Sequence, residues 1–534
     1  MLARKAVLLA TVIIAAALLA TEISFGDWEP PPPPKPGRLK AAEGFPPGPG
    51  PLPGPVTPIR RTEKKREPAK PALIGKIQYG NEKWVTTDDG RRFSILDWQS
   101  DTTDLYLLLN FTNAKLGLNY RYIETTLASF TWNPAELPVL YFTGHDDFIF
   151  TDLELQSLGW YLRDGGTLIG DACCGASNFA AAFTRNIKLI FPDRPFREIA
   201  PDDPIYHCYL DVDEVAYQEE GKQPAKTRPN LRGMYLGCRI AVILSTHDMS
   251  CGWARHEHPQ GKRIAAEDAN RIGLNLITYV LANYQYAKSC SLQKVYHAEE
   301  GEQRPRDQFI FGQVVHGGDW DPNPTAVPNL LKHLAANSTI DVPFRLEACG
   351  VRLAAEDSDS GPKPQASSPK PDPASLQPGQ SGAFRYPFIY MTGHEDFELT
   401  EQEVAGLRGY LANGGVLLAN ACCGRQAFDT AFRRELRKVC VDQPLHALPP
   451  DHPLFFSLYS IKRVDFTPWL KELSPKLDVP QLEGISLGGQ LAVVYSKYDL
   501  GSGWEAINHP YSLGYTSEDA MKIGANVVVY AMTH

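Results

Sequence analysis

The pattern of apolar and polar residues repeats in two stretches of the chain, residues 138–175 and 387–424, which align without a gap. Each stretch has a short apolar run, then apolar residues at helical spacing, then a second apolar run. Self-similarity of this length indicates that one structural unit occurs twice. The sequence therefore predicts two tandem copies of one domain, copy one and copy two.

Each stretch is predicted to fold as a strand, a helix and a second strand. The first apolar run is short and continuous, which is typical of a strand buried on both faces. The helix begins with a capping box, in which Thr151 or Thr400 is followed three residues later by glutamate. Because a crossover of this kind is right-handed, we expect the two strands to be parallel. The residues that follow them then lie at one edge of the sheet, where open α/β sheets bind their ligands.

The same periodicities predict further elements around each stretch. A Gly-His turn ends the first strand, where the glycine is expected to permit a tight turn, and glycines at 165 and 414 are expected to end the helix in a left-handed conformation. Copy two is expected to open with a strand near residue 309. The other expected elements are helices at 105–116, 326–336, near Phe179 and Phe428, and near Ile272 and Ile523, and strands at 239–245 and 490–496.

Three motifs resemble the bacterial family called domain of unknown function 4159. They are the turn TGHxDF at His145 and His394, the unit LxxYLxxGGxL after it, and a later Asp-Pro or His-Pro turn at Pro204 and Pro453. The resemblance implies an α/β fold with parallel sheets, in two tandem flavodoxin-like domains of the class I glutamine amidotransferase type. The family has no established activity, so the resemblance implies a fold rather than a function.

The ends and joints of the chain have a different composition. Arg4 and Lys5 precede an apolar run at 6–20, and Ser24 and Gly26 have the spacing of a signal-peptidase site. An uncleaved membrane anchor is the alternative to a cleaved signal. Segments rich in proline, serine and glycine predict disorder. The predicted organisation is a signal peptide at 1–26, a disordered proline-rich linker at 27–72, copy one at 73–287, a linker at 288–306, and copy two at 307–534 with a disordered insertion at 355–383.

Composition and charge narrow the function. The 534 residues carry a net charge of −9, which argues against general nucleic-acid binding. The ten cysteines include no CxxC pair, and no glycine-rich phosphate loop is present. We therefore expect no cofactor and no metal. A site made of His145, Asp147 and His247 stays an alternative in copy one, although Tyr498 takes the place of the second histidine in copy two.

The two predicted sheet edges collect the residues that are able to do chemistry. Both copies keep a Gly-His turn, an aspartate two residues later, a Cys-Cys-Gly turn and a late His-Pro pair. Agreement between two diverged copies indicates a shared constraint, either functional or structural. In the structural alternative the paired cysteines are small residues that fill a crowded strand-to-helix turn, and the histidines bond to the backbone. The predicted binding edges comprise His145, Asp147, His247, Asp248, His394, Asp396, Cys422, Asp499 and His509.

A cysteine hydrolase or amidotransferase is the catalytic hypothesis. Cys173 follows a strand and precedes a helix, as a nucleophile does in an elbow turn. The candidate base is His258 and the candidate carboxylate is Asp171. Amidotransferases resembling this fold carry His-Pro-Glu at the base, whereas this chain has Gln260 and Tyr511 after its two His-Pro pairs. The missing carboxylate leaves the triad incomplete.

The sequence therefore favours an exported, non-catalytic protein of the bacterial cell envelope that binds a small ligand or an envelope protein. The expected location is the periplasm or envelope, or the inner membrane if the signal stays as an anchor. The alternative function is a cysteine-dependent amidohydrolase with Cys173 as the nucleophile in copy one. The ligand, the partner and the oligomeric state are left open by the residues.

Overall fold

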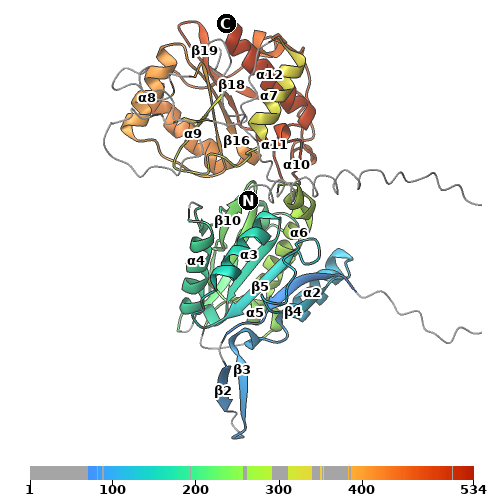
Figure 1. Ribbon diagram of the computed structural model, residues 1–534. Helices are drawn as coiled ribbons and strands as arrows, with labels where there is room; N and C mark the ends of the chain where they lie inside the picture. The colour runs from blue at the N-terminus through green and yellow to red at the C-terminus, as the bar shows by residue number, and fades with distance from the viewer. Residues whose placement is uncertain are drawn as a thin grey trace, which may run out of the picture. The chain divides into compact units, whose positions relative to one another are not determined.

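The computed structural model describes residues 70–290 and 311–534, with gaps at 81, 87–88, 193, 220, 257–260, 340–348, 352, 354–382, 384–385 and 508. The predicted signal peptide, nearly all of the proline-rich linker, most of the linker at 288–306 and most of the insertion at 355–383 lie outside the described residues. Both copies belong to one compact unit, and each is built around a seven-stranded sheet (Figure 1).

The sheet of copy one contains five strands that pair in parallel, followed by two strands that join through antiparallel pairing. Its spatial order is β4-β1-β5-β6-β11-β10-β7, so the parallel strands run 2-1-3-4-5 in chain order. Strands β10 and β7 pair antiparallel at one side. The strands are β1 (Ala72–Ile77), β4 (Arg121–Thr125), β5 (Val139–Gly144), β6 (Thr167–Ala172), β7 (Arg197–Glu198), β10 (Arg232–Leu236) and β11 (Arg239–Ser245).

Copy two repeats this sheet strand for strand. The order β14-β13-β15-β16-β19-β18-β17 again gives five parallel strands in the sequence 2-1-3-4-5. The strands are β13 (Phe311–Val314), β14 (Cys349–Val351), β15 (Phe388–Gly393), β16 (Val416–Ala421), β17 (His446–Ala447), β18 (Leu482–Leu487) and β19 (Gln490–Ser496). The duplication predicted from the periodicity is therefore present in three dimensions.

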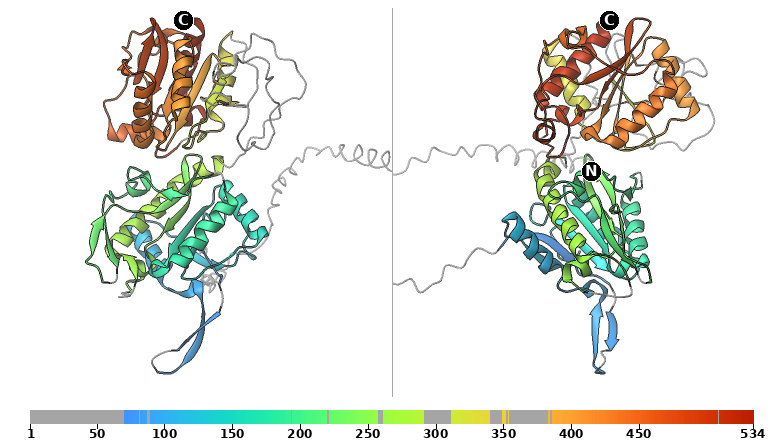
Figure 2. Two further views of the ribbon diagram at one scale, coloured as in Figure 1. Left: turned by 90° about the vertical axis from the view of Figure 1, so that its left-hand side faces the viewer. Right: turned by 180° about the vertical axis from the view of Figure 1, so that it is seen from behind.

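Helices cover both faces of each sheet (Figure 2). In copy one, α2 (Asp104–Leu116), α5 (Ser250–Ala254) and α6 (Ala266–Cys290) pack on one face, and α3 (Asp152–Arg163) and α4 (Ser177–Ile190) on the other. In copy two, α7 (Ala326–Asn337), α11 (Gly501–Trp504) and α12 (Ser517–Thr533) oppose α8 (Glu401–Ala412) and α9 (Gln426–Val439). Alternate residues of a strand enter the two cores, as Tyr141 and Phe142 do.

Smaller elements extend the two sheets. A hairpin of β2 (Glu82–Thr86) and β3 (Arg92–Leu96) projects from copy one in Figure 1. A second small sheet joins β8 (Val215–Glu219), β9 (Ala225–Thr227) and β12 (Lys262–Ile264). Copy two adds α10 (Pro468–Leu473). Among the described helices, none combines the length and the apolar character that a bilayer span requires.

The local predictions are confirmed, with one correction. Both capping boxes form, and the glycines at 165 and 414 have φ of 100° and 87°. The glycine of the Gly-His turn, however, is not needed for a tight turn, because Gly144 is the last residue of β5. A Cβ atom there would lie 2.3 Å from both the Tyr79 hydroxyl and the Asp97 carboxylate. Gly144 is required by close approach rather than by backbone conformation.

Candidate functional site

The Cys-Cys-Gly turn follows the central strand of each sheet, β6 or β16. Its second cysteine adopts a left-handed backbone, with φ of 54° at Cys174 and 53° at Cys423. Non-glycine residues rarely take this conformation, which costs roughly 1–2 kcal/mol. Both copies keep it, so the turn brings two adjacent thiols to the same place in each domain.

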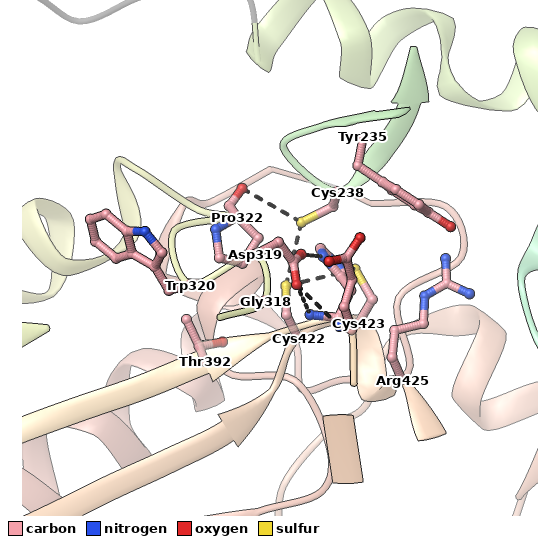
Figure 3. Close-up of polar contacts among 12 residues, drawn as sticks. Tyr235, Cys238, Gly318, Asp319, Trp320, Pro322, Thr392, Cys422, Cys423 and Arg425 are labelled. Atoms are coloured by element: carbon pink, nitrogen blue, oxygen red, sulfur yellow. Dashed lines mark hydrogen bonds and ion pairs between the residues drawn. The ribbon is translucent and has the colours of Figure 1, made fainter. Parts of the chain in front are cut away.

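In copy two, four soft donor atoms converge at the sheet edge. Cys238, His394, Cys422 and Cys423 place one ligand atom each within 4.8 Å of all the others, and all four residues are buried. The Cys238 and Cys422 Sγ atoms are 3.5 Å apart, the Cys422 and Cys423 Sγ atoms 4.0 Å, and His394 Nε2 lies 3.3 Å from the Cys423 Sγ. Figure 3 shows Cys238 reaching this cluster from the turn between β10 and β11, which belongs to copy one.

Three of the six separations among these atoms are close to the edges of a tetrahedral zinc site. With zinc–sulfur bonds of about 2.3 Å and a zinc–nitrogen bond of about 2.0 Å, a regular tetrahedron has edges of about 3.5 to 3.8 Å. The observed separations of 3.3, 3.5 and 4.0 Å bracket that range. Three sulfurs and one imidazole form a donor set typical of structural zinc.

Asp319 orients the histidine of this cluster. Its Oδ2 accepts from His394 Nδ1 at 2.6 Å, and its Oδ1 accepts from the backbone N–H groups of His394 and Glu395 at 2.8 and 3.1 Å. The ring is therefore held with Nε2 directed at the thiols. A carboxylate behind a ligating histidine is the usual second layer of a zinc site. Asn323 contacts two of the thiols, since its Nδ2 donates to the Cys238 Sγ at 3.1 Å and its Oδ1 accepts from the Cys422 Sγ at 2.9 Å.

The electrostatics of the cluster favour one thiolate even without a metal. Burial is the largest influence on the pKa of the Cys423 thiol and raises it, but hydrogen bonds from Cys238 and Cys422 and the nearby His509 and His394 bring that pKa well below its ordinary value. Burial also lowers the pKa of His394, yet the Asp319 carboxylate and the Cys423 thiolate raise it well above the ordinary value. Burial raises the pKa of Cys422. The site thus favours a Cys423 thiolate beside a charged imidazole.

Copy one has a matching cluster with a different third sulfur. Cys173, Cys174, Cys251 and the Asp248 carboxylate lie within 4.8 Å of one another. Asp248 is already committed, because it accepts from the N–H of Cys174 at 2.5 Å, the N–H of Cys251 at 2.8 Å and the Ser250 hydroxyl at 2.9 Å. It positions the thiols rather than offering a free ligand atom.

His145 takes the place of His394 in copy one. Its Nδ1 lies 3.4 Å from the Asp97 Oδ1 and 3.1 Å from the Ser100 hydroxyl. Asp97 also accepts from the backbone N–H groups of His145 and Asp146, as Asp319 does in copy two. The hydrogen bond to Asp97, together with the Cys174 thiol, raises the pKa of His145 to about 9. Hydrogen bonds from Cys173 and Cys251, with a smaller one from His145, lower the pKa of Cys174.

The third thiol has two different origins. Copy two carries Ser502 at the position of Cys251, so it lacks a sulfur of its own there. Cys238 supplies that sulfur from copy one, whereas the corresponding turn of copy two contains Gly488 and Gly489. Each edge therefore has three thiols and one histidine, although the third thiol comes from unrelated parts of the chain.

The other predicted edge residues have structural partners. Asp171 is buried and accepts from the N–H groups of Met249 and Ser250, at 2.9 and 3.0 Å. Asp147 is 62% exposed and pairs with Arg185. The remaining residues also have partners within the protein. Asp396 pairs with Arg434, and His247 packs on Tyr217 and faces Glu219. Asp499 accepts from Gly501 N and the Ser502 hydroxyl, and His509 Nε2 donates to the Cys238 carbonyl.

This placement bears on both alternatives raised by the sequence. His145, Asp147 and His247 each face different partners, so the structure does not gather them as a metal site. His258 lies outside the described residues, and the catalytic role of Cys173, His258 and Asp171 stays a prediction. The expectation that no metal is bound rested on the spacing of cysteines along the chain, which says nothing about thiols brought together by the fold.

Sequence reasoning missed four residues of the clusters: Asp97, Asp319, Cys238 and Cys251. One signal was available for the two aspartates, since both copies have an Asp-Trp pair upstream of the Gly-His turn, at 97–98 and 319–320. No repeat signal marks the two cysteines, because each belongs to one copy only.

Comparison with known proteins identifies both copies. A family model described as domain of unknown function (DUF4159) matches residues 83–281 and 364–532. A comparison with curated proteins gives no match.

Proposed function

We propose that this chain, which belongs to the DUF4159 family, is a non-catalytic binding protein whose copy-two edge holds a zinc ion. The description of the family assigns no activity, so the proposal rests on the geometry of the site. The ligands are the thiolates of Cys238, Cys422 and Cys423 and the Nε2 atom of His394. Asp319 holds the imidazole, and Asn323 Nδ2 donates to the Cys238 sulfur. Cys422, whose thiol donates to Asn323 Oδ1 in the metal-free cluster, gives up that proton when it binds the metal.

A single observation carries this proposal. Four buried donor atoms that suit zinc lie within 4.8 Å of one another, and a buried carboxylate orients the one imidazole among them. Thiolates and a histidine select zinc over magnesium or calcium, which prefer oxygen ligands. All four positions are filled by the protein, which is the arrangement of a structural rather than a catalytic zinc site.

The zinc would also explain the polar core at this place. The described thiols are buried among other polar groups, with Cys422 fully buried and Cys423 2% exposed. One charged imidazole offsets the cost of one buried thiolate, whereas three buried thiolates require a divalent cation in addition. Binding free energy at such a site adds to folding free energy, because the unfolded chain has no preformed site. Zinc therefore stabilises the folded chain and ties the β10–β11 turn to copy two.

The finer fold and the location are part of the same proposal. The strand order 2-1-3-4-5 supports flavodoxin-like domains of the amidotransferase type. The basic and apolar N-terminal sequence supports export to the envelope, with an uncleaved anchor as the alternative. N-terminal sequencing of the native protein decides between them: a start near residue 27 supports cleavage, and an intact Met1 in the membrane fraction supports the anchor.

A cysteine hydrolase in copy one is the second candidate function, and one observation changes its nucleophile. Cys174, rather than Cys173, interacts with His145, whose Nδ1 faces Asp97. Nucleophile, base and orienting carboxylate stand in this order in cysteine hydrolases. Hydrolysis of an amide or ester that is lost in Cys174→Ser and kept in Cys422→Ser would support this candidate.

Metal analysis tests the zinc proposal. The full chain is purified and kept reduced without oxygen, loaded with zinc, dialysed and analysed for bound metal. We expect Cys422→Ser to lose one equivalent of zinc relative to the unaltered chain. The matched control is Cys440→Ser, which removes a buried thiol of copy two outside the cluster. Equal zinc in all three proteins, or a disulfide between Cys238 and Cys422 that persists in reductant, would refute the proposal.

A further inference from the structure

We infer that copy one holds a second zinc ion at Cys173, Cys174 and Cys251, in a site that stays open to a fourth ligand and exchanges its metal. This inference rests on the proposed function, because it uses the same donor chemistry, but the residues are different and the two can fail separately. No ligand of the copy-two cluster takes part in the copy-one site.

The fold gathers three thiols at the edge of the copy-one sheet. Cys173 and Cys174 come from the turn after β6, and Cys251 comes from the first turn of α5. Their sulfur atoms lie within 4.8 Å of one another and of the Asp248 carboxylate. Asp248 holds two of the three residues by their backbone N–H groups. The thiols are thus fixed by the fold rather than brought together by surface chance.

A third thiol is present at both sheet edges, Cys251 in copy one and Cys238 at the edge of copy two. Where copy two has lost it, with Ser502 in place of Cys251, a cysteine from another part of the chain reaches the same edge. Packing alone has no need for such a replacement, because a serine or alanine fills that space. A requirement for three sulfur ligands at each edge explains both arrangements.

The fourth coordination position of the metal differs between the two copies. In copy two, a ring nitrogen of His394 is one of the four ligand atoms that lie within 4.8 Å of one another, and the His394 side chain is 3% exposed. The corresponding group in copy one, among the described residues, consists of three thiols and Asp248 without His145. The side chain of His145 is 37% exposed, and Cys174 is half-buried. Solvent therefore reaches the copy-one site, and a metal there has a position that water, a small thiol or the His145 ring fills in turn.

The two sites consequently differ in kind. A closed site with four protein ligands holds a structural zinc, whereas three protein ligands leave the fourth position for an exchangeable ligand. The copy-one site is the one at which zinc enters and leaves, and at which a thiol or imidazole from a partner completes the coordination. The ligand of this edge is thus a thiol or an imidazole that binds through the metal.

Metal release from the reduced full chain tests the inference. The zinc-loaded protein is mixed with an excess of a coloured zinc chelator in a phosphine reductant, and the release is followed with time. We expect two equivalents of zinc, half released in a fast phase and half in a slow phase. Cys251→Ser should lose the fast equivalent and keep the slow one, and Cys238→Ser should do the reverse. Serine is the residue that copy two carries at the matching position, so the fold accommodates it.

The control variant is Cys208→Ser, which removes a half-buried thiol of copy one outside the cluster and should keep both phases. Circular dichroism confirms that each variant is folded. If no protein shows a fast phase and Cys238→Ser loses the slow phase, the copy-one site is refuted and the copy-two site stands. If Cys251→Ser loses zinc and Cys238→Ser keeps all of it, the proposed function is refuted instead. Rapid alkylation of Cys174 in zinc-loaded protein, at the rate seen without zinc, would also refute this inference.

Discussion

Replacing Asp319 by asparagine removes one oxygen acceptor and leaves the shape of the side chain. The carboxylate accepts from three donors at once: two backbone N–H groups on Oδ1 and the His394 Nδ1–H on Oδ2. Asparagine has one acceptor oxygen and one donor NH2 group. Whichever way the amide is turned, a donor faces a donor. Either His394 Nδ1–H loses its partner, or the two backbone groups do.

The size of the effect follows from this mismatch. Leaving a buried donor without a partner costs roughly 1–3 kcal/mol. Loss of the carboxylate behind a ligating histidine typically weakens metal binding by about 10- to 100-fold, which is about 1.4 to 2.8 kcal/mol. We therefore expect Asp319→Asn to lower the zinc affinity of the copy-two site within that range and to lower the melting temperature of the metal-free protein modestly.

Competition with a chromophoric chelator measures the affinity. The variant is made in the Cys251→Ser background, so that only the copy-two site contributes. The control is Asp396→Asn, because that carboxylate is 64% exposed and pairs with Arg434 at the surface. An unchanged zinc affinity in a folded Asp319→Asn protein would refute the reasoning, because the carboxylate would then brace the turn without serving a metal ligand.

Three further predictions concern the same edges. Gly144→Ala should lower the stability of copy one by about 1–3 kcal/mol in thermal melts, because its new methyl group meets Tyr79 and Asp97. Asp147→Ala should change stability by no more than about 1 kcal/mol, because its ion pair with Arg185 is exposed. Zinc affinity should fall as the pH is lowered, since protons compete for the thiolates and the imidazole, and chelator titrations at several pH values measure this.

The sequence was sufficient for two α/β copies with parallel strands because the relevant signals are local, whereas the antiparallel strands β10 and β7 and the hairpin of β2 and β3 were not predicted. The apolar runs, the capping boxes at Thr151 and Thr400 and the helix-ending glycines each lie within one stretch, and their repetition confirmed the pattern. The parallel pairing of β5 with β6 then follows from the handedness of the crossover.

The candidate site was only half predictable because it joins distant segments. The Gly-His and Cys-Cys-Gly turns were placed together from topology alone. Asp319 was missed because it follows a different strand, β13, and Cys238 because it comes from the other copy. Asp147 was chosen for its spacing in the turn, yet it points to Arg185, and Asp97 braces the turn instead. Spacing along the chain does not report which side chains a sheet edge brings together.

X-ray absorption at the zinc edge tests the central claim most directly. The sample is the reduced Cys251→Ser protein loaded with zinc, in which the copy-two site is the remaining cluster. The account predicts a first shell of three sulfurs at about 2.3 Å and one nitrogen at about 2.0 Å. A shell of oxygen and nitrogen alone, or a protein that retains no zinc after dialysis, would contradict it.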